Sequence, residues 1–131
     1  MANPNIVNVA TINGVTTYLN PSTVNDTVLL TNPAGSGHVY KVNLLNVSNI
    51  NGSTNIATTI SLYTNGAVAQ GSAPSGGTAY PIVSTVSVPA NASLIVTDKT
   101  TAFYLQEGRS ISITSATASK LTFTVSYEDI S

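Results

Sequence analysis

A single histidine and five carboxylates provide most of the acid–base chemistry open to this chain of 131 residues. His38 is the only imidazole, and Ser36 precedes it between two glycines. A catalytic histidine needs a carboxylate and a nucleophile within reach. The glycine–serine–glycine spacing does not match the sharp turn that presents a nucleophilic serine in hydrolases. We therefore expect His38 to lie at a turn edge or on the surface, without a catalytic role.

The carboxylates show no arrangement that favours chemistry. They are Asp26, Asp98, Glu107, Glu128 and Asp129. A glycosidase needs two carboxyl groups that face each other across a bond, whereas successive residues such as Glu128 and Asp129 point to opposite sides of a strand. A cation needs several converging oxygen ligands, and Asp26 alone, or Asp98 with Asn91, could supply only part of such a set. The sequence predicts no catalytic residues, no metal ligands and no cofactor.

The distribution of charge along the chain also argues against an enzyme. Residues 42–97 contain no charged side chain and no histidine, so an active site would have to be built from the two ends of the chain. Four basic residues against five acidic ones leave no positive surface for phosphates, and we expect no nucleic-acid partner. No apolar run is long enough to span a membrane, and the first ten residues lack the features of a signal peptide.

Tyrosine is the main aromatic residue, with six copies against two phenylalanines and no tryptophan. An aromatic ring offers an apolar face for stacking, which is how carbohydrate-binding surfaces hold sugars. Tyr63 falls on the face opposite to Ile60 and Leu62, and Tyr80 and Tyr18 flank turns. We therefore keep Tyr63 and Tyr80 as candidate ligand-binding or interface residues.

The composition favours association with other subunits. Asn, Ser and Thr make up 49 of the 131 residues, and charged residues make up 7% against a typical value of about 25%. Val, Ile and Leu supply enough apolar surface for a core, so the solvent face must consist mainly of uncharged hydroxyl and amide groups. A net charge of −1 opposes association only weakly. The absence of cysteine excludes disulfides and thiolate metal sites.

The dominant period of the sequence is two, which is typical of β-strands with one buried face. Leu121–Tyr127 (LTFTVSY) is the clearest case, and Ile111 and Ile113 alternate with polar residues in the same way. Because residues 115–120 between them are small and polar, we predict that these two strands form a hairpin. Residues 56–62 form a third alternating segment.

A longer run, His38–Asn49, changes phase at Leu44–Leu45, which predicts a β-bulge or a bend between two sheets. Three Asn-Gly pairs, at residues 13–14, 51–52 and 65–66, are candidates for type I′ hairpin turns. Strands at intervals of about 8–12 residues predict an all-β fold, an antiparallel two-sheet sandwich that is jelly-roll-like. We expect residues 1–5 to form an extended N-terminal arm and residues 6–131 to form a single domain.

Two segments in the C-terminal third carry a recognisable order of residues. They are VSVPANASLIV (residues 86–96) and AFYLQEGRSISITSATASKLTFTVSYEDIS (residues 102–131). This order resembles small virion structural proteins of tailed bacteriophages, of which marine and cyanobacterial phages carry many. The closing VSYEDIS is the most specific part of the resemblance. Arg109 is a departure, because this family more often has an acidic residue there.

The resemblance implies a non-enzymatic role in a virus particle, with the virion as location. We expect a capsid decoration (cement) protein that binds the major capsid protein and stabilises the head, or a neck, baseplate or tail-fibre component that binds other virion proteins. Homotrimers are common among such proteins, so a homo-oligomer is expected, with a trimer favoured. The alternative from another functional class is a carbohydrate-binding module for host adhesion that uses Tyr63 or Tyr80.

Overall fold

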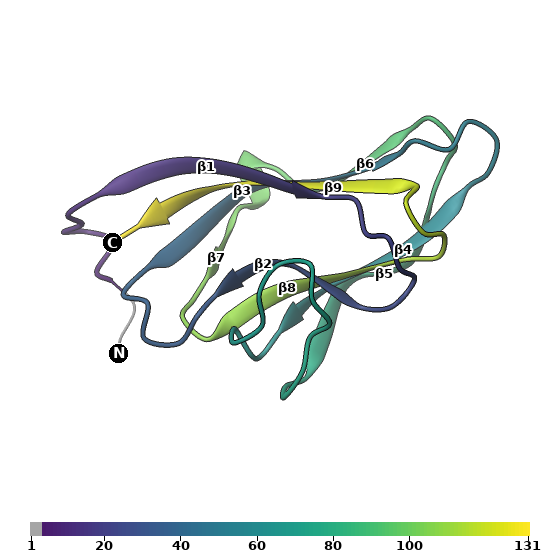
Figure 1. Ribbon diagram of the computed structural model, residues 1–131. Coiled ribbons are helices and arrows are strands. Elements are labelled where there is room, and N and C mark those ends of the chain that lie inside the picture. Colours follow the sequence, from purple (N-terminus) through teal and green to yellow (C-terminus); the bar gives the residue numbers. More distant parts are fainter. Residues whose placement is uncertain (1–3) are drawn as a thin grey trace.

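The computed structural model describes residues 4–131 and consists of β-strands, loops and one turn of 3-10 helix (Figure 1). The strands are β1 (Ile12–Leu19), β2 (Thr27–Asn32), β3 (Val39–Asn49), β4 (Ile56–Tyr63), β5 (Ala79–Val88), β6 (Ser93–Thr97), β7 (Phe103–Leu105), β8 (Arg109–Ser115) and β9 (Leu121–Ile130), and the helical turn η1 (Lys99–Thr101) lies between β6 and β7. The predicted all-β class is confirmed. Most of the predicted N-terminal arm, residues 1–5, lies outside the described residues. Within the described part, no helix is long and apolar enough to cross a membrane.

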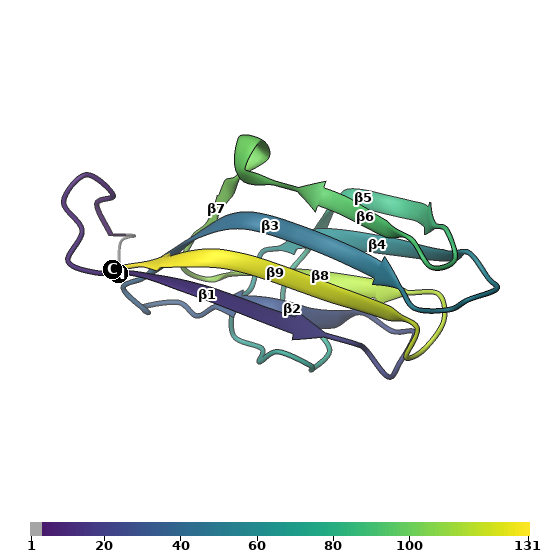
Figure 2. The same ribbon diagram turned by 90° about the horizontal axis from the view of Figure 1, so that it is seen from above.

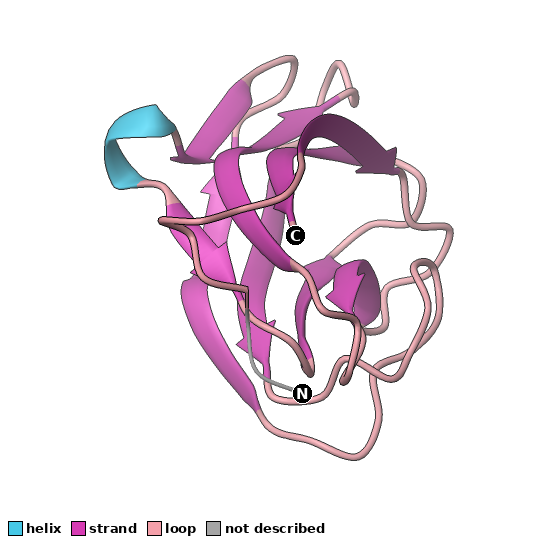
Figure 3. Cartoon of the chain, turned by 90° about the vertical axis from the view of Figure 1, so that its left-hand side faces the viewer, coloured by secondary structure: helices cyan, strands magenta, loops and turns pink. Residues whose placement is uncertain are grey.

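The strands form two antiparallel sheets that pack face to face (Figure 1, Figure 2). Sheet A has the order β1-β9-β3-β6, with β7 also paired to β3, and sheet B has the order β2-β8-β4-β5. Because β6 and β7 pair with different parts of β3, they act as one edge strand that η1 interrupts. Figure 3 shows η1 at the margin of the sandwich. Counted in this way, eight strands are distributed between the sheets in the order of a jelly roll, as predicted.

The predicted hairpin between residues 110 and 127 is wrong. β8 pairs with β2 and β4 in sheet B, whereas β9 lies between β1 and β3 in sheet A. The polar connection at residues 116–120 therefore crosses from one sheet to the other. The apolar residues of the two strands, such as Ile113 and Phe123, face each other across the core instead of lying side by side. Apolar and polar residues alternate in the same way whether two strands pair within one sheet or pack against each other from facing sheets. The period of two therefore cannot distinguish these arrangements.

The phase change in β3 is confirmed as a bulge. The pairing of β3 with β9 shifts between Val42 and Leu44, close to the predicted position. Val42, Leu45 and Val47 all turn into the core, which would not be possible without an extra residue between the first two. None of the three Asn-Gly pairs forms the predicted type I′ turn, since no residue of these pairs has a positive φ.

A buried asparagine ties the two sheets together at the end of β2. Asn32 is fully buried, and its Nδ2 donates hydrogen bonds to the carbonyl oxygens of His38 (2.9 Å) and Leu105 (3.0 Å). Its Oδ1 accepts a hydrogen bond from the Ser36 hydroxyl at 2.6 Å. The side chain thus satisfies backbone groups of the β2–β3 loop and of β7, which belong to segments that do not pair with β2.

Asn49 repeats this arrangement at the end of β3. Its side chain is 2% exposed, and its Nδ2 donates to the carbonyl oxygens of Thr54 and Val88, each at 2.9 Å. Its Oδ1 accepts from the amide of Asn51. At both positions the chain passes from one sheet to the other. An amide side chain there replaces the backbone hydrogen-bond partners that the chain loses when it leaves a strand.

The long connection between β4 and β5, residues 64–78, folds back over sheet B. Its backbone pairs with the edge strand β2, because the amide of Val28 donates to Ser72 and the amide of Gly71 donates to Val28, each at 2.9 Å. The hydroxyl of Ser110 on β8 donates to the carbonyl of Asn65 at 2.8 Å. The edge of sheet B at β2 is therefore covered, whereas no segment within residues 4–131 covers the opposite edge at β5.

The turn η1 begins at a capping residue whose ionisation should make the stability of the protein depend on pH. The Asp98 carboxylate accepts hydrogen bonds from the hydroxyl and the amide of Thr100, which hold its pKa below the usual value of 3.8. A depressed pKa in the folded state stabilises the protein above the unfolded pKa, and this contribution is lost as the pH falls through the folded value. We expect Asp98→Ala to lower the melting temperature at pH 7 and to change it much less at a pH well below 3.8.

Thermal unfolding followed by circular dichroism at both pH values measures this difference. Asp26→Ala, which removes an exposed carboxylate outside η1, is the matched control and should have little effect at either pH. An Asp98→Ala effect of the same size at both pH values would contradict the capping role of the ionised carboxylate.

Candidate functional site

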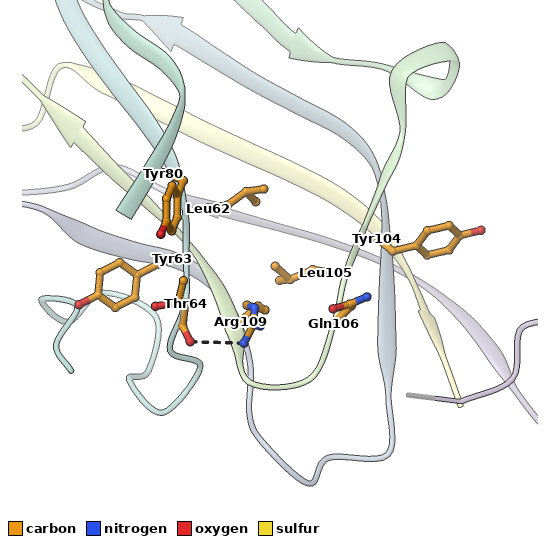
Figure 4. Close-up of a pocket in the computed structure, with 8 residues that line it drawn as sticks. All are labelled: Leu62, Tyr63, Thr64, Tyr80, Tyr104, Leu105, Gln106 and Arg109. Carbon is orange, nitrogen blue, oxygen red and sulfur yellow. Dashed lines mark hydrogen bonds between the residues drawn. The ribbon is translucent and has the colours of Figure 1, made fainter. Parts of the chain in front are cut away.

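A cleft opens at one side of the sandwich, between the strands β4 and β5 of sheet B and the end of β7 in sheet A (Figure 4). Its volume is about 420 Å³, which lies within the usual range of small-ligand sites, about 300–1,000 Å³. Leu62 and Tyr80, which are paired across β4 and β5, line one wall. Leu105 and Gln106, at the end of β7, line the other wall. The cleft exists because the two sheets end there without a strand that closes the gap between them.

Among the described residues that line the cleft, Arg109 has the only charged side chain. It is the first residue of β8 and is exposed, and its Nη1 donates to the carbonyl oxygens of Thr64 (3.4 Å) and Gly108 (3.2 Å). Figure 4 shows the guanidinium between the two walls. Within residues 4–131, the recorded ion pairs are those of His38 with Asp129 and of Lys41 with Glu128, so Arg109 takes part in neither.

The two tyrosines predicted from the sequence both border this cleft, but in different states. Tyr63 is 8% exposed, and its hydroxyl accepts a hydrogen bond from the amide of Gly77 at 3.0 Å, so it holds the β4–β5 connection in place. Tyr80 is 61% exposed at the open edge of sheet B. Tyr104, on the far rim, points away from the other residues in Figure 4. Of the two predicted residues, only Tyr80 has free ring surface for a ligand.

Sequence reasoning missed Arg109 and Gln106 as site residues. They reach the cleft through the tight turn between β7 and β8, where Gly108 has a φ of 72°. One signal was available, because Arg109 is the position where the residue departs from the virion-protein pattern. The sequence alone did not indicate that this position lines the same cleft as Tyr80, because their strands are not neighbours in the sheet and β4 lies between them.

A second polar cluster lies at the start of β3, where this strand pairs with the end of β9. His38 Nδ1 lies 2.5 Å from Asp129 Oδ1, so the single histidine does have a carboxylate within reach. Ser36 does not complete a triad, because its hydroxyl donates to Asn32 and accepts from the amide of His38. A hydrolytic triad needs a nucleophile at the second ring nitrogen, and no such hydrogen bond is recorded within residues 4–131. The pair therefore ties the β2–β3 loop to β9.

Asp129 of this cluster also affects the pKa of two neighbouring tyrosine hydroxyls, those of Tyr40 and Tyr127. The rings of Tyr40 and Tyr127 lie 4.7 Å apart, centroid to centroid. Burial raises the pKa of both hydroxyls above 10.0, and the nearby charge of Asp129 adds to this shift. Neither phenol is thus set up as an acid or base near neutral pH. The described residues also contain no group of three or more His, Cys, Asp or Glu side chains that could hold a metal ion.

Exposed apolar residues gather on two opposite sides of the sandwich. The first, which we call the β5 side, is formed by edge strands of both sheets and carries Tyr80, Ile82, Val86, Ile95 and Tyr104. The second, the β1 side, is the other edge of sheet A and carries Ile12 and Tyr18. The strands of the β5 side contain no charged residue.

Comparison of the chain with protein-family models, with curated proteins and with solved structures finds no match.

Proposed function

We propose that this chain is a non-enzymatic structural protein of a tailed-phage virion, and specifically a capsid decoration protein that binds the major capsid protein and stabilises the head. The sequence resemblance of residues 86–96 and 102–131 supports the virion as its location. The observation that carries a role in assembly is the open edge strand β5. It is ten residues long, and nine of them are partly or fully exposed.

An open edge strand is a ready template for pairing with another chain. Natural proteins usually protect such edges with charged residues, short strands or a covering loop. β2 has such a cover, whereas β5 carries no charge, and its protection is limited to one proline, Pro81, and to the bulges where its pairing with β4 shifts between Thr58 and Ser61. An open edge of this kind suits a protein in which a strand of a neighbouring subunit pairs with that edge in the assembled particle.

The two apolar sides also suit a closed ring. A contact between the β5 side of one copy and the β1 side of the next is heterologous, and such contacts form a ring when the rotation closes. Since the strands of both sides carry no charged residue, like charges do not oppose the contact, and the charged group next to the β5 side, Arg109, lies at the start of β8 in the cleft. We infer that three copies form the ring, as is common among the proteins that the sequence resembles.

The proposal predicts stoichiometric presence of the chain in purified virions and a trimer in solution. Sedimentation analysis of the isolated chain should give about three times the monomer mass of 13.4 kDa. Quantitative mass spectrometry of purified particles, with separated heads and tails, then places the protein. Its absence from particles would end the proposal, and its presence only in tails would replace the head by a neck, baseplate or fibre location.

One substitution on the β5 side tests the contact itself. Ile82→Lys adds a charge to the open edge, where the isoleucine is 44% exposed, and should convert the trimer to monomers. Val24→Lys is the matched control, since Val24 is 54% exposed in the loop before β2 and should leave the trimer intact. An unchanged trimer in Ile82→Lys would show that the subunits meet elsewhere.

A further inference from the structure

We propose that the cleft between β5 and β7 binds an acidic saccharide, with the sugar ring against Tyr80 and its carboxylate paired with Arg109. This inference concerns a ligand site in the chain itself and does not rest on the proposed role in a virion. Because Tyr80 and Tyr104 also belong to the β5 side, it requires that the contact between subunits leaves the part of this side next to the cleft uncovered. It takes up the carbohydrate alternative, but assigns it to a different set of residues, in which Tyr63 has a structural role.

The positive charge of Arg109 in the cleft favours an anionic ligand. Within residues 4–131, Arg109 is the single charged residue of the lining, and no carboxylate forms an ion pair with it. Its Nη1 is oriented by the carbonyl oxygens of Thr64 and Gly108, which fixes part of the guanidinium. A guanidinium presents five donors in a planar fork that matches the two oxygens of a carboxylate. A ligand with a carboxylate would therefore complete the hydrogen bonds of this group.

The remaining lining selects a sugar ring. Leu62, Leu105 and the exposed ring of Tyr80 offer apolar surface, against which the C–H groups of a pyranose can pack. Gln106 adds an amide that both donates and accepts, and no hydrogen bond of this side chain is recorded within residues 4–131. An apolar surface, an amide and one cation together match a ring that has an apolar face, hydroxyl groups and one carboxylate.

Other anions fit less well. Nucleic acids and polyphosphates are held by several cations, and this cleft has one. A purely apolar acid would leave the amide of Gln106 unpaired, and a neutral sugar would leave the guanidinium without its counter-charge. The volume of about 420 Å³ suits a short stretch of saccharide, with the chain continuing into solvent on either side.

Titration calorimetry of the isolated chain tests this site. The probes are tetrasaccharides of galacturonic, glucuronic and mannuronic acid, together with their methyl esters, which keep the rings and remove the charges. At least one acid should bind, and its ester should bind about tenfold more weakly or worse. Binding should also weaken as salt is added, since an exposed ion pair is screened.

Four variants locate the site. Arg109→Gln and Tyr80→Ala should each weaken binding by about tenfold or more. Lys41→Gln and Tyr18→Ala are the matched controls, because they remove an exposed cation and an exposed phenol outside the cleft and should leave binding unchanged. All four residues are exposed or half-buried, so circular dichroism should show the native fold.

Three outcomes would overturn the inference: no heat with any acid at up to about 10 mM, equal binding of an acid and its ester, or equal losses in Arg109→Gln and Lys41→Gln. The last result would mean that the anion is attracted by net charge alone. Tyr80 also belongs to the β5 side, so the oligomeric state of each variant is measured in parallel. If Tyr80→Ala dissociates the oligomer, Arg109→Gln decides the ligand site, and the two proposals can fail separately.

Discussion

Replacement of Gly66 by alanine is expected to lower the free energy of unfolding by about 3 kcal/mol. Gly66 is buried where the β4–β5 connection passes the ends of β2 and β8. A Cβ atom there would lie closest to the carbonyl oxygen of Asn32 and 2.9 Å from both the amide nitrogen and the carbonyl oxygen of Arg109. All three are backbone atoms, so no flexible side chain can move aside. The connection or the two strand ends would have to shift.

Urea denaturation measures this loss, which corresponds to a fall in melting temperature of about 10 °C for a chain of this length. Gly14→Ala is the matched control. Like Gly66, Gly14 has no positive φ, but an added Cβ there would meet nothing within 4 Å, and the stability should change little. A difference between the two variants of less than about 1 kcal/mol would mean that the passage of the loop over sheet B is less tight than its backbone distances indicate.

Asn32→Asp should have an effect of similar or larger size, about 3–5 kcal/mol at pH 7. The substitution keeps the shape of the side chain but replaces the donor Nδ2 by an acceptor. The new carboxylate would face the carbonyl oxygens of His38 and Leu105 at about 3 Å in a fully buried position. It would therefore lose two hydrogen bonds and place an unpaired charge against two partial negative charges.

The loss of stability in Asn32→Asp should grow as the pH rises. Burial and the two carbonyl groups would raise the pKa of the new carboxyl group in the folded state above its unfolded value. Stability is then highest below the unfolded pKa, and it falls as the pH rises through the folded pKa. Asn55→Asp is the matched control, because the exposed Asn55 accepts a hydrogen bond from the amide of Ala90, which a carboxylate can also accept. A loss in Asn32→Asp that does not change between pH 4 and pH 7 would contradict a buried ionisation.

The sequence predicted the fold class because alternation depends on local chemistry. Each strand that buries one face must repeat with a period of two, and the residues of β9 do so for most of its length. Pairing depends instead on which sheet a strand joins, and the sequence contains no local signal for that choice. The same polar connection that suggested a hairpin between β8 and β9 serves as a crossing between the sheets.

The cleft could be predicted only in part, for a related reason. Tyr80 was identified because its ring lies next to a turn and outside the expected core. Arg109 and Gln106 come from a different part of the chain. They line the same cleft as Tyr80 because β8 and β5 flank β4 in sheet B and β7 lies in the facing sheet. The structural roles of Asn32 and Asn49 could not be predicted from the sequence. Asparagine is common throughout this chain, and only burial distinguishes these two residues.

The central position of β9 in sheet A affects the order of events during protein synthesis. β1, near the start of the described chain, has β9 as its pairing partner within its sheet, and β3 also pairs with β9 along most of its length. Until the ribosome has released residues as far as Ile130, both strands expose unpaired backbone and apolar side chains in the growing polypeptide. A nascent chain of this protein therefore depends on rapid completion or on chaperones, and premature termination before Leu121 would yield an aggregation-prone product and no native sandwich.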